Sequence, residues 1–79
     1  MLHSAHIRGA RALLGWRQME LADRAKVGLA TIQRLERAPP GPVMAQVSTI
    51  VKIEECLKEA GVVFLDSDPT GGIGVRLSR

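Results

Sequence analysis

The sequence predicts a small, mainly α-helical domain of four to five helices that ends in a short β-hairpin. Apolar residues recur at helical spacing through most of residues 4–61. Gly15 and Gly61 stand where helices would stop. Residues 62–79 read instead as two short strands around a turn rich in Gly, Asp and Pro. We therefore divide the chain into a helical part, residues 1–61, and a C-terminal hairpin for packing or dimerisation, residues 62–79.

Length and charge limit the classes of function. A chain of 79 residues with one cysteine suits a single domain without disulfides, whose modest stability a homodimer would raise. The net charge is +3, but residues 1–38 hold seven Lys/Arg against three Asp/Glu, whereas residues 39–79 hold four against five. Basic charge concentrated on one half favours a polyanionic partner over a neutral one.

The sequence shows neither a signal peptide nor a membrane-spanning run, so we expect a cytoplasmic protein without membrane contact. Cys56 has no cysteine partner and falls in a helical stretch, which predicts a semi-buried residue. His3 and His6 are three apart but have no third ligand near them, so we expect exposed imidazoles and no metal or other cofactor.

The first expected helix runs from a cap at Ser4 to about Leu14, and Gly15 supplies its left-handed end. Arg11 is a polar residue on the otherwise apolar face of that helix. Trp16, the only tryptophan, should cover the junction with the next helix.

Residues 18–37 predict two short helices joined by a tight turn. Leu21, Ala22 and Ala25 keep a helical period, which stops at 27–28. Ile32 and Leu35 then restart the period and anchor the second helix. The opposite face of this second helix should point outward, with the size and chemistry that suit a DNA major groove; its residues are Leu29, Ala30, Gln33, Arg34 and Arg37.

The segment RALLGWRQMELADRAKVGLATIQRLER resembles the Cro/CI-type helix-turn-helix of the XRE family of bacterial and phage repressors. The family pattern RxxxGxxQxxLAxxxGVxxxTIxRxE is matched in register by Arg11, Gly15, Gln18, Leu21, Ala22, Val27, Thr31, Ile32, Arg34 and Glu36. The resemblance implies a lambda-repressor-like fold and binding to double-stranded DNA. It is strongest to small single-domain members.

The resemblance also implies roles for single residues. Arg11 would pair with Glu36, and Gln18 would contact the DNA backbone. Two positions depart from the pattern. Arg17 stands where the family has a Ser or Thr helix cap. Lys26 stands where the family has Gly in a left-handed turn. That turn is therefore either strained or built differently, with Gly28 absorbing part of the change.

Base contacts are expected from Arg34 to guanine and from Gln33 to adenine. Leu29 and Ala30 would touch thymine methyl groups or contribute little to readout. Thr31 would hold a phosphate, as would Arg37. The full expected DNA-binding set is Arg17, Gln18, Leu29, Ala30, Thr31, Gln33, Arg34 and Arg37.

The Pro-rich segment 38–42 interrupts the helices, and the next helix begins at Val43 or only at Ser48. In the following strand, Val62 and Phe64 point to one side and Val63 and Leu65 to the other, so neither face is polar. Something must cover both faces, and a second subunit is the economical candidate.

These observations favour a transcriptional regulator that binds specific DNA sequences as a homodimer. One alternative is a DNA-binding antitoxin whose C-terminal part holds a toxin protein. Another is a protein-interaction module with the same fold. An enzyme is not expected, because the sequence offers no nucleophile–base pair, clustered carboxylates or metal-ligand spacing.

Overall fold

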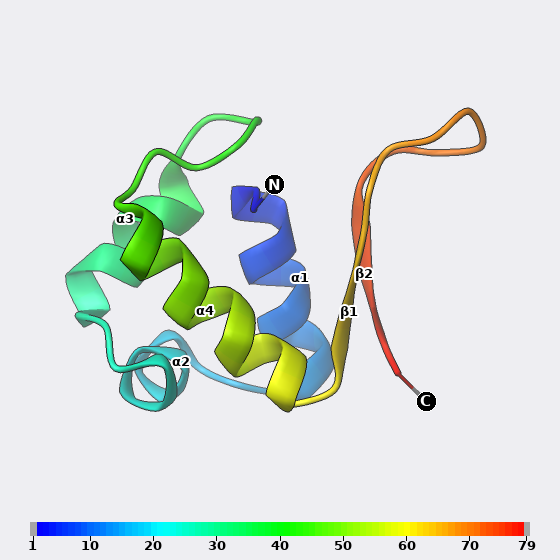
Figure 1. Ribbon diagram of the computed structural model, residues 1–79. Coiled ribbons are helices and arrows are strands. Elements are labelled where there is room, and N and C mark those ends of the chain that lie inside the picture. Colours follow the sequence, from blue (N-terminus) through cyan, green and yellow to red (C-terminus); the bar gives the residue numbers. More distant parts are fainter. Residues whose placement is uncertain (1, 79) are drawn as a thin grey trace.

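The computed structural model describes residues 2–78, which form four helices and one hairpin. The elements are α1 (Ser4–Leu14), α2 (Gln18–Ala25), α3 (Leu29–Arg37), α4 (Val47–Glu59), β1 (Val62–Leu65) and β2 (Gly74–Leu77). The four helices gather on one side, while the hairpin stands beside α1 and its tip reaches away from the helices (Figure 1). The predicted mainly helical fold with a C-terminal hairpin is therefore confirmed.

The core lies where all four helices meet. Its largest fully buried apolar side chains are Ile7, Leu21, Ile32, Leu35, Ile53 and Leu57. Helix α2 packs on α3 and α4, and α1 packs on α3 and β2. Among the helices of residues 2–78, none combines the length and the apolar character needed to cross a lipid bilayer.

The start of α1 differs from the prediction. The cap residue is His3 rather than Ser4, which is itself helical and buried. The expectation of two exposed imidazoles is wrong for His6, because the residue is 2% exposed and its ring packs edge-on against Phe64, with ring centroids 5.4 Å apart. His6 Nδ1 accepts the backbone N–H of His3 at 3.0 Å, so the imidazole completes the helix start that we had assigned to a serine. Gly15 ends α1 at φ 69°, as expected.

The turn between α2 and α3 is built on a lysine. Lys26 takes the left-handed conformation itself, with φ 59° and ψ 45°. Gly28 is extended, with φ −69°, and caps α3, so it does not absorb the change that Lys26 introduces. A side chain in this conformation costs about 1 kcal/mol relative to glycine.

Helix α4 begins at Val47, one residue before the later of the two expected starts. The segment between α3 and α4 is fixed to the N-terminus, because the N–H of Val43 donates to the carbonyl of Leu2 at 2.9 Å. The helix ends at Glu59, and Gly61 then turns the chain at φ 101° into β1.

The hairpin pairs Val62 with Leu77 and Phe64 with Val75. These four side chains face the helices and pack on or within the core. Contact with α1 is close, since a Cβ atom added to Gly9 would lie 2.9 Å from Cγ2 of Val75. The glycine lets the helix and the sheet approach.

Candidate nucleic-acid interface

Helix α3 presents a polar side opposite its core side. Ile32 and Leu35 are buried, while Ala30, Arg34 and Arg37 are exposed. Two of the residues expected on the outer face, Leu29 and Gln33, are only partly exposed, and so is Thr31, which we expect to hold a phosphate. Leu29 packs against the core, which leaves it less area for a ligand than the sequence suggested.

The carboxylate of Glu36 fixes α3 to the other helices. Arg11 Nε donates to Glu36 Oε2 at 2.6 Å, and Arg11 Nη2 donates to Oε1 at 2.8 Å. Gln18 Nε2 adds a bond to Oε1 at 3.1 Å. The structure thus contains the Arg11–Glu36 pair, in a two-pronged geometry, and this pairing raises the pKa of Arg11 above its ordinary value.

Two further contacts strengthen this network. The Arg8 guanidinium donates to the backbone carbonyl of Glu36, and Arg11 Nη1 donates to the carbonyl of Trp16 at 2.9 Å. Helices α1 and α2 therefore both hold the last turn of α3, and the carbonyl of Trp16 anchors Arg11 in place. We call the side chains of Arg8, Arg11, Gln18 and Glu36 the Glu36 network. The contact of Arg8 with the carbonyl of Glu36 could not be predicted from sequence spacing.

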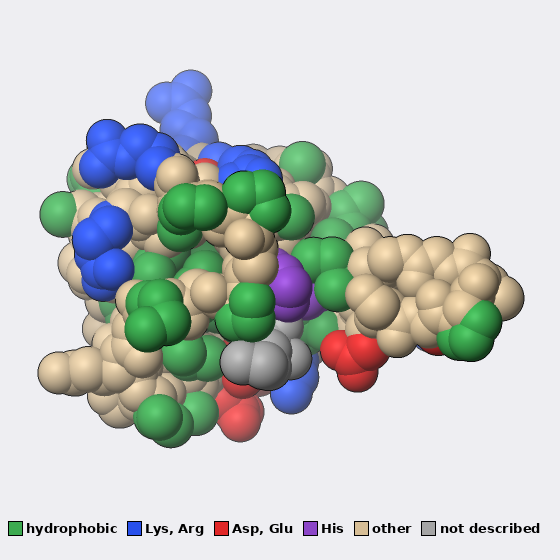
Figure 2. Space-filling view, turned by 90° about the horizontal axis from the view of Figure 1, so that it is seen from above, with side chains coloured by type: hydrophobic (Ala, Val, Ile, Leu, Met, Phe, Trp, Pro, Cys, Tyr) green, Lys and Arg blue, Asp and Glu red, His purple; other side chains and the backbone are tan. Residues whose placement is uncertain are grey.

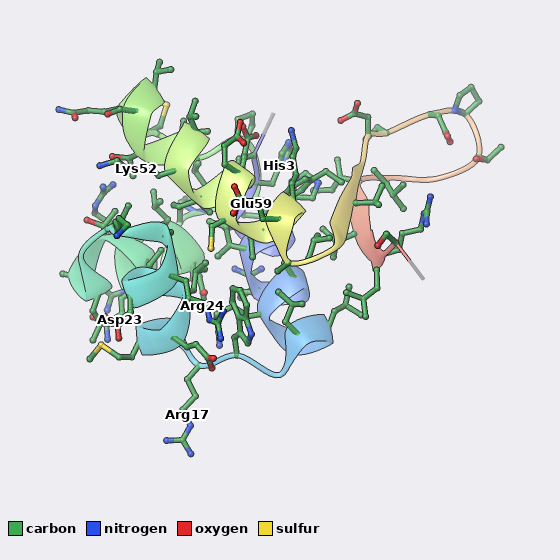
Figure 3. All side chains as sticks on the ribbon, turned by 60° about the horizontal axis from the view of Figure 1, so that its bottom comes forward. His3, Arg17, Asp23, Arg24, Lys52 and Glu59 are labelled. Atoms are coloured by element: carbon green, nitrogen blue, oxygen red, sulfur yellow. The ribbon has the colours of Figure 1, made fainter. Side chains whose placement is uncertain are left out.

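Trp16 covers the junction of α1 and α2 as expected, partly buried against the core. Arg24 lies over its ring, with the guanidinium carbon 4.6 Å from the centroid, and also donates to Glu20 at 3.2 Å. Figure 3 shows Arg24 directed toward the body of the molecule. Only the fold brings this tryptophan and this arginine together.

At the start of α2, Arg17 and Gln18 take opposite directions. Gln18 turns inward, because its amide N–H is donated to Glu36. Arg17 is exposed and projects away from the helices (Figure 3). Arg17 is the cap residue of α2 and its side chain makes no capping hydrogen bond, so the first N–H groups of α2 face outward beside a cation.

At the other end of the surface, Arg34 contacts the segment that follows α3. Its Nη1 donates to the carbonyl of Met44 at 3.3 Å. Arg34 and Arg37 line one side of an open groove of about 520 Å³, whose other side is formed by Pro39, Pro40, Pro42 and Met44. The sequence did not reveal this contact, because a Pro-rich segment carries no periodicity from which its path can be predicted.

The exposed cations of the helical part are Arg8, Arg17, Arg24, Lys26, Arg34, Arg37, Lys52 and Lys58. Figure 2 shows Lys and Arg side chains gathered along one side of the helical part, whereas the projecting hairpin tip shows none on that face. The guanidinium groups and backbone N–H groups exposed on α2 and α3 can attract an anion.

Within residues 2–78, no group of three His, Cys, Asp or Glu side chains is arranged to hold a metal ion.

No family model matches the chain, and no curated protein shows a significant sequence match to it. We therefore infer function from the geometry of α2 and α3.

Proposed function

We propose that this protein is a DNA-binding transcriptional regulator that acts as a homodimer and inserts α3 into the major groove. One observation carries the proposal. The last turn of α3 is held from behind by the Glu36 network, while the opposite side exposes Ala30, Arg34 and Arg37. A helix fixed in this way presents its outer side chains in a defined orientation, which base recognition requires. The family resemblance of residues 11–37 to Cro/CI-type, lambda-repressor-like domains points to the same role.

Base recognition would come from the exposed face of α3. Arg34 uses one guanidinium nitrogen on Met44, which orients the group and leaves its other N–H groups for guanine O6 and N7. Gln33 is half-exposed beside it and would pair with adenine. Ala30, with Leu29 in part, would meet thymine methyl groups.

Phosphate binding would come from the two ends of the surface. Arg17 and the first N–H groups of α2 would hold one strand. Arg37 and Thr31 would hold a phosphate on the other side, and exposed Lys26 adds charge at the turn. In this arrangement Gln18 acts chiefly by positioning α3 through Glu36.

Selection of bound duplexes from a random-sequence pool by the purified protein tests the proposal. We expect enrichment of a two-fold site with half-sites about one helical turn, roughly 34 Å, apart. Affinity for each enriched site should fall steeply as salt rises. Failure to enrich any sequence, with only weak salt-dependent binding, would contradict a sequence-specific regulator and favour a protein-binding role.

Arg34 and Arg37 should differ in their effects on that site. Arg34→Ala should lose about 1–3 kcal/mol of discrimination at one base pair. Arg37→Ala should weaken binding to all sequences alike and reduce the salt slope by about 0.9. Arg76→Ala removes an equal charge from exposed β2 and serves as the matched control. Equal losses on every sequence for both α3 variants would refute the separate roles.

A further inference from the structure

The free edge of β1 is a surface that the proposed DNA contacts leave unused. Within residues 2–78 the sheet has two strands, so β1 pairs with β2 on one side only. Ser78 N–H donates to the Gly61 carbonyl at 2.7 Å, which sets the alternation of the antiparallel ladder. By that alternation the backbone groups of Val63 and Leu65 turn toward β2, and those of Val62 and Phe64 turn outward.

A groove runs along this free edge. It has a volume of about 440 Å³, and its lining residues come from α4 and from β1 with the residue after it: Glu54, Lys58, Val62, Val63, Phe64 and Asp66. The groove therefore combines outward backbone donors and acceptors, apolar side chains and charges of both signs. A strand edge of this composition can pair with an identical edge, because an antiparallel two-fold partner presents the same groups in reverse order.

The far face of the hairpin adds a second reason for a partner. Leu65 is 39% exposed, and Val63, which shares its face, is half-exposed. Neither face of β1 is polar, yet exposure rises along the strand from buried Val62 to exposed Leu65, so the helices cover it incompletely. An exposed edge with apolar side chains is one that soluble proteins cover or pair.

We propose that a second copy of this chain pairs with the free edge of β1, antiparallel and about a two-fold axis, and that this is the surface of the proposed homodimer. In the register we assign, Phe64 lies opposite the partner's Phe64, and Val63 lies opposite the partner's Leu65. This register makes a four-stranded sheet and uses the backbone groups that face outward. It also pairs apolar side chains across the two-fold axis.

The charges agree with this register. Val62 lies opposite the partner's Asp66, and Lys58 lines the groove next to Val62. Each Lys58 ammonium thus meets an Asp66 carboxylate of the partner subunit, twice per dimer. Charge complementarity of this kind fixes register and partner more than it adds affinity. A wholly basic partner would place like charge against Lys58, and a wholly acidic partner would place like charge against the carboxylates of Glu54 and Asp66.

Directed disulfide formation tests the register. In the Cys56→Ser background, Val63→Cys protein is mixed with Leu65→Cys protein that carries a longer tag, and the mixture is oxidised and run on a non-reducing gel. In the assigned register, position 63 of one chain and position 65 of the other form a non-hydrogen-bonded pair. The Cα atoms of such a pair lie about 4.5 Å apart, a separation that suits a disulfide. We expect a covalent dimer of mixed tag in the mixture, and little in either variant alone. Met44→Cys, at a highly exposed site away from β1, replaces Val63→Cys as the control. Crosslinking no greater than that control would overturn the proposal.

Charge exchange gives an independent measurement in the uncrosslinked protein. Lys58→Glu and Asp66→Lys should each raise the dimer dissociation constant roughly tenfold, since two exposed ion pairs are lost per dimer. The double variant should restore it. Unchanged dissociation constants in both single variants, by sedimentation equilibrium and with unchanged circular dichroism, would overturn the assigned register.

The β1 dimer surface rests on the proposed function only in assuming that the protein is a homodimer. The regulator and the dimer surface can therefore be refuted separately. A crosslinked, two-fold dimer that binds no DNA would refute the regulator and leave the β1 surface standing. A site-specific DNA-binding dimer with no β1 crosslink would refute the surface and leave the regulator standing.

Discussion

The α2–α3 pair and the C-terminal hairpin are held to the rest of the molecule by different forces. Hydrogen bonds and an ion pair to buried Glu36 fix α3 against α1 and α2. Within residues 2–78, the hairpin rests on α1 through apolar packing, and the polar contact between them is a long one of 3.5 Å from His6 Nε2 to the Leu65 carbonyl. Directional bonds fix an orientation, whereas apolar packing fixes only proximity. We therefore expect the first region to resist reorientation and the second to adjust to a partner.

The largest effect should follow removal of the guanidinium behind α3. Arg11→Ala leaves the buried Glu36 carboxylate without its cation, which should cost about 3 kcal/mol of unfolding free energy. Urea denaturation measures the change. Glu20→Gln, which removes an exposed ion pair with Arg24 and leaves the stacking of Arg24 on Trp16, is the control and should cost about 1 kcal/mol or less. Equal losses in the two variants would mean that the Glu36 network contributes no more than a surface ion pair.

A smaller effect should follow a methyl group placed between α1 and the hairpin. Gly9→Ala puts a Cβ 2.9 Å from Val75 Cγ2, so the sheet must shift, at a cost of about 1–3 kcal/mol. Hydrogen exchange should show lost protection in β1 and β2 while α2 and α3 keep theirs. Val75→Ala in the same chain should restore part of the packing. Uniform loss of protection through all elements would show that the two regions do not behave separately.

The turn of the α2–α3 pair stores a modest strain. Lys26→Gly should raise the free energy of unfolding by up to about 1 kcal/mol, because glycine adopts φ 59° without steric cost. Gly15→Ala, at φ 69°, should lower it by a similar amount. The melting temperatures of both variants check the signs. Lys26→Gly should also weaken DNA binding slightly through the lost charge. A lower melting temperature for Lys26→Gly would contradict the assigned strain.

The smallest effect concerns pH at the contact of α1 with the hairpin. Burial lowers the pKa of His6 below 6.5, further lowered by nearby His3 and opposed by the Leu65 carbonyl and Asp66. The unfolded chain therefore binds more protons between the folded pKa and 6.5, so stability falls as pH drops through that window and is fully present above it. Protonation of Nδ1 would also break its bond with the N–H of His3. His6→Gln should flatten the pH dependence of the melting temperature below pH 6.5, whereas His3→Gln should leave most of it in place. Identical slopes in all three proteins would exclude His6 as the cause.

The sequence predicted the parts of the fold that depend on local pattern. Periodicity and glycine position were enough for α1 to end at Leu14, for α2 to begin at Gln18 and for the hairpin to follow Gly61. The lysine turn shows the limit, because a left-handed lysine is allowed but is not indicated by spacing. The start of α1 shows it again, since His6 is buried only because Phe64, far along the chain, packs on it.

The candidate site could be predicted where it follows helical spacing, and not where it depends on tertiary contact. Arg11 and Glu36 were paired through a family resemblance, and the structure holds them together. The contact of Arg34 with Met44, the inward turn of Gln18 and the stacking of Arg24 on Trp16 required the relative placement of helices and of the Pro-rich segment. Helical periodicity shows which residues share a face of one helix, but not how the helices are placed relative to one another.

In the proposed function, the outer face of α3 rather than the hairpin meets DNA. Mapping of backbone amide shifts by NMR tests it directly, with an isotope-labelled protein titrated with a mixed-sequence duplex at low salt. We expect shifts concentrated at Arg17, at the first turn of α2 and through α3, with β2 and the hairpin turn unchanged. Shifts concentrated on the hairpin or α4, with α3 unchanged, would contradict it.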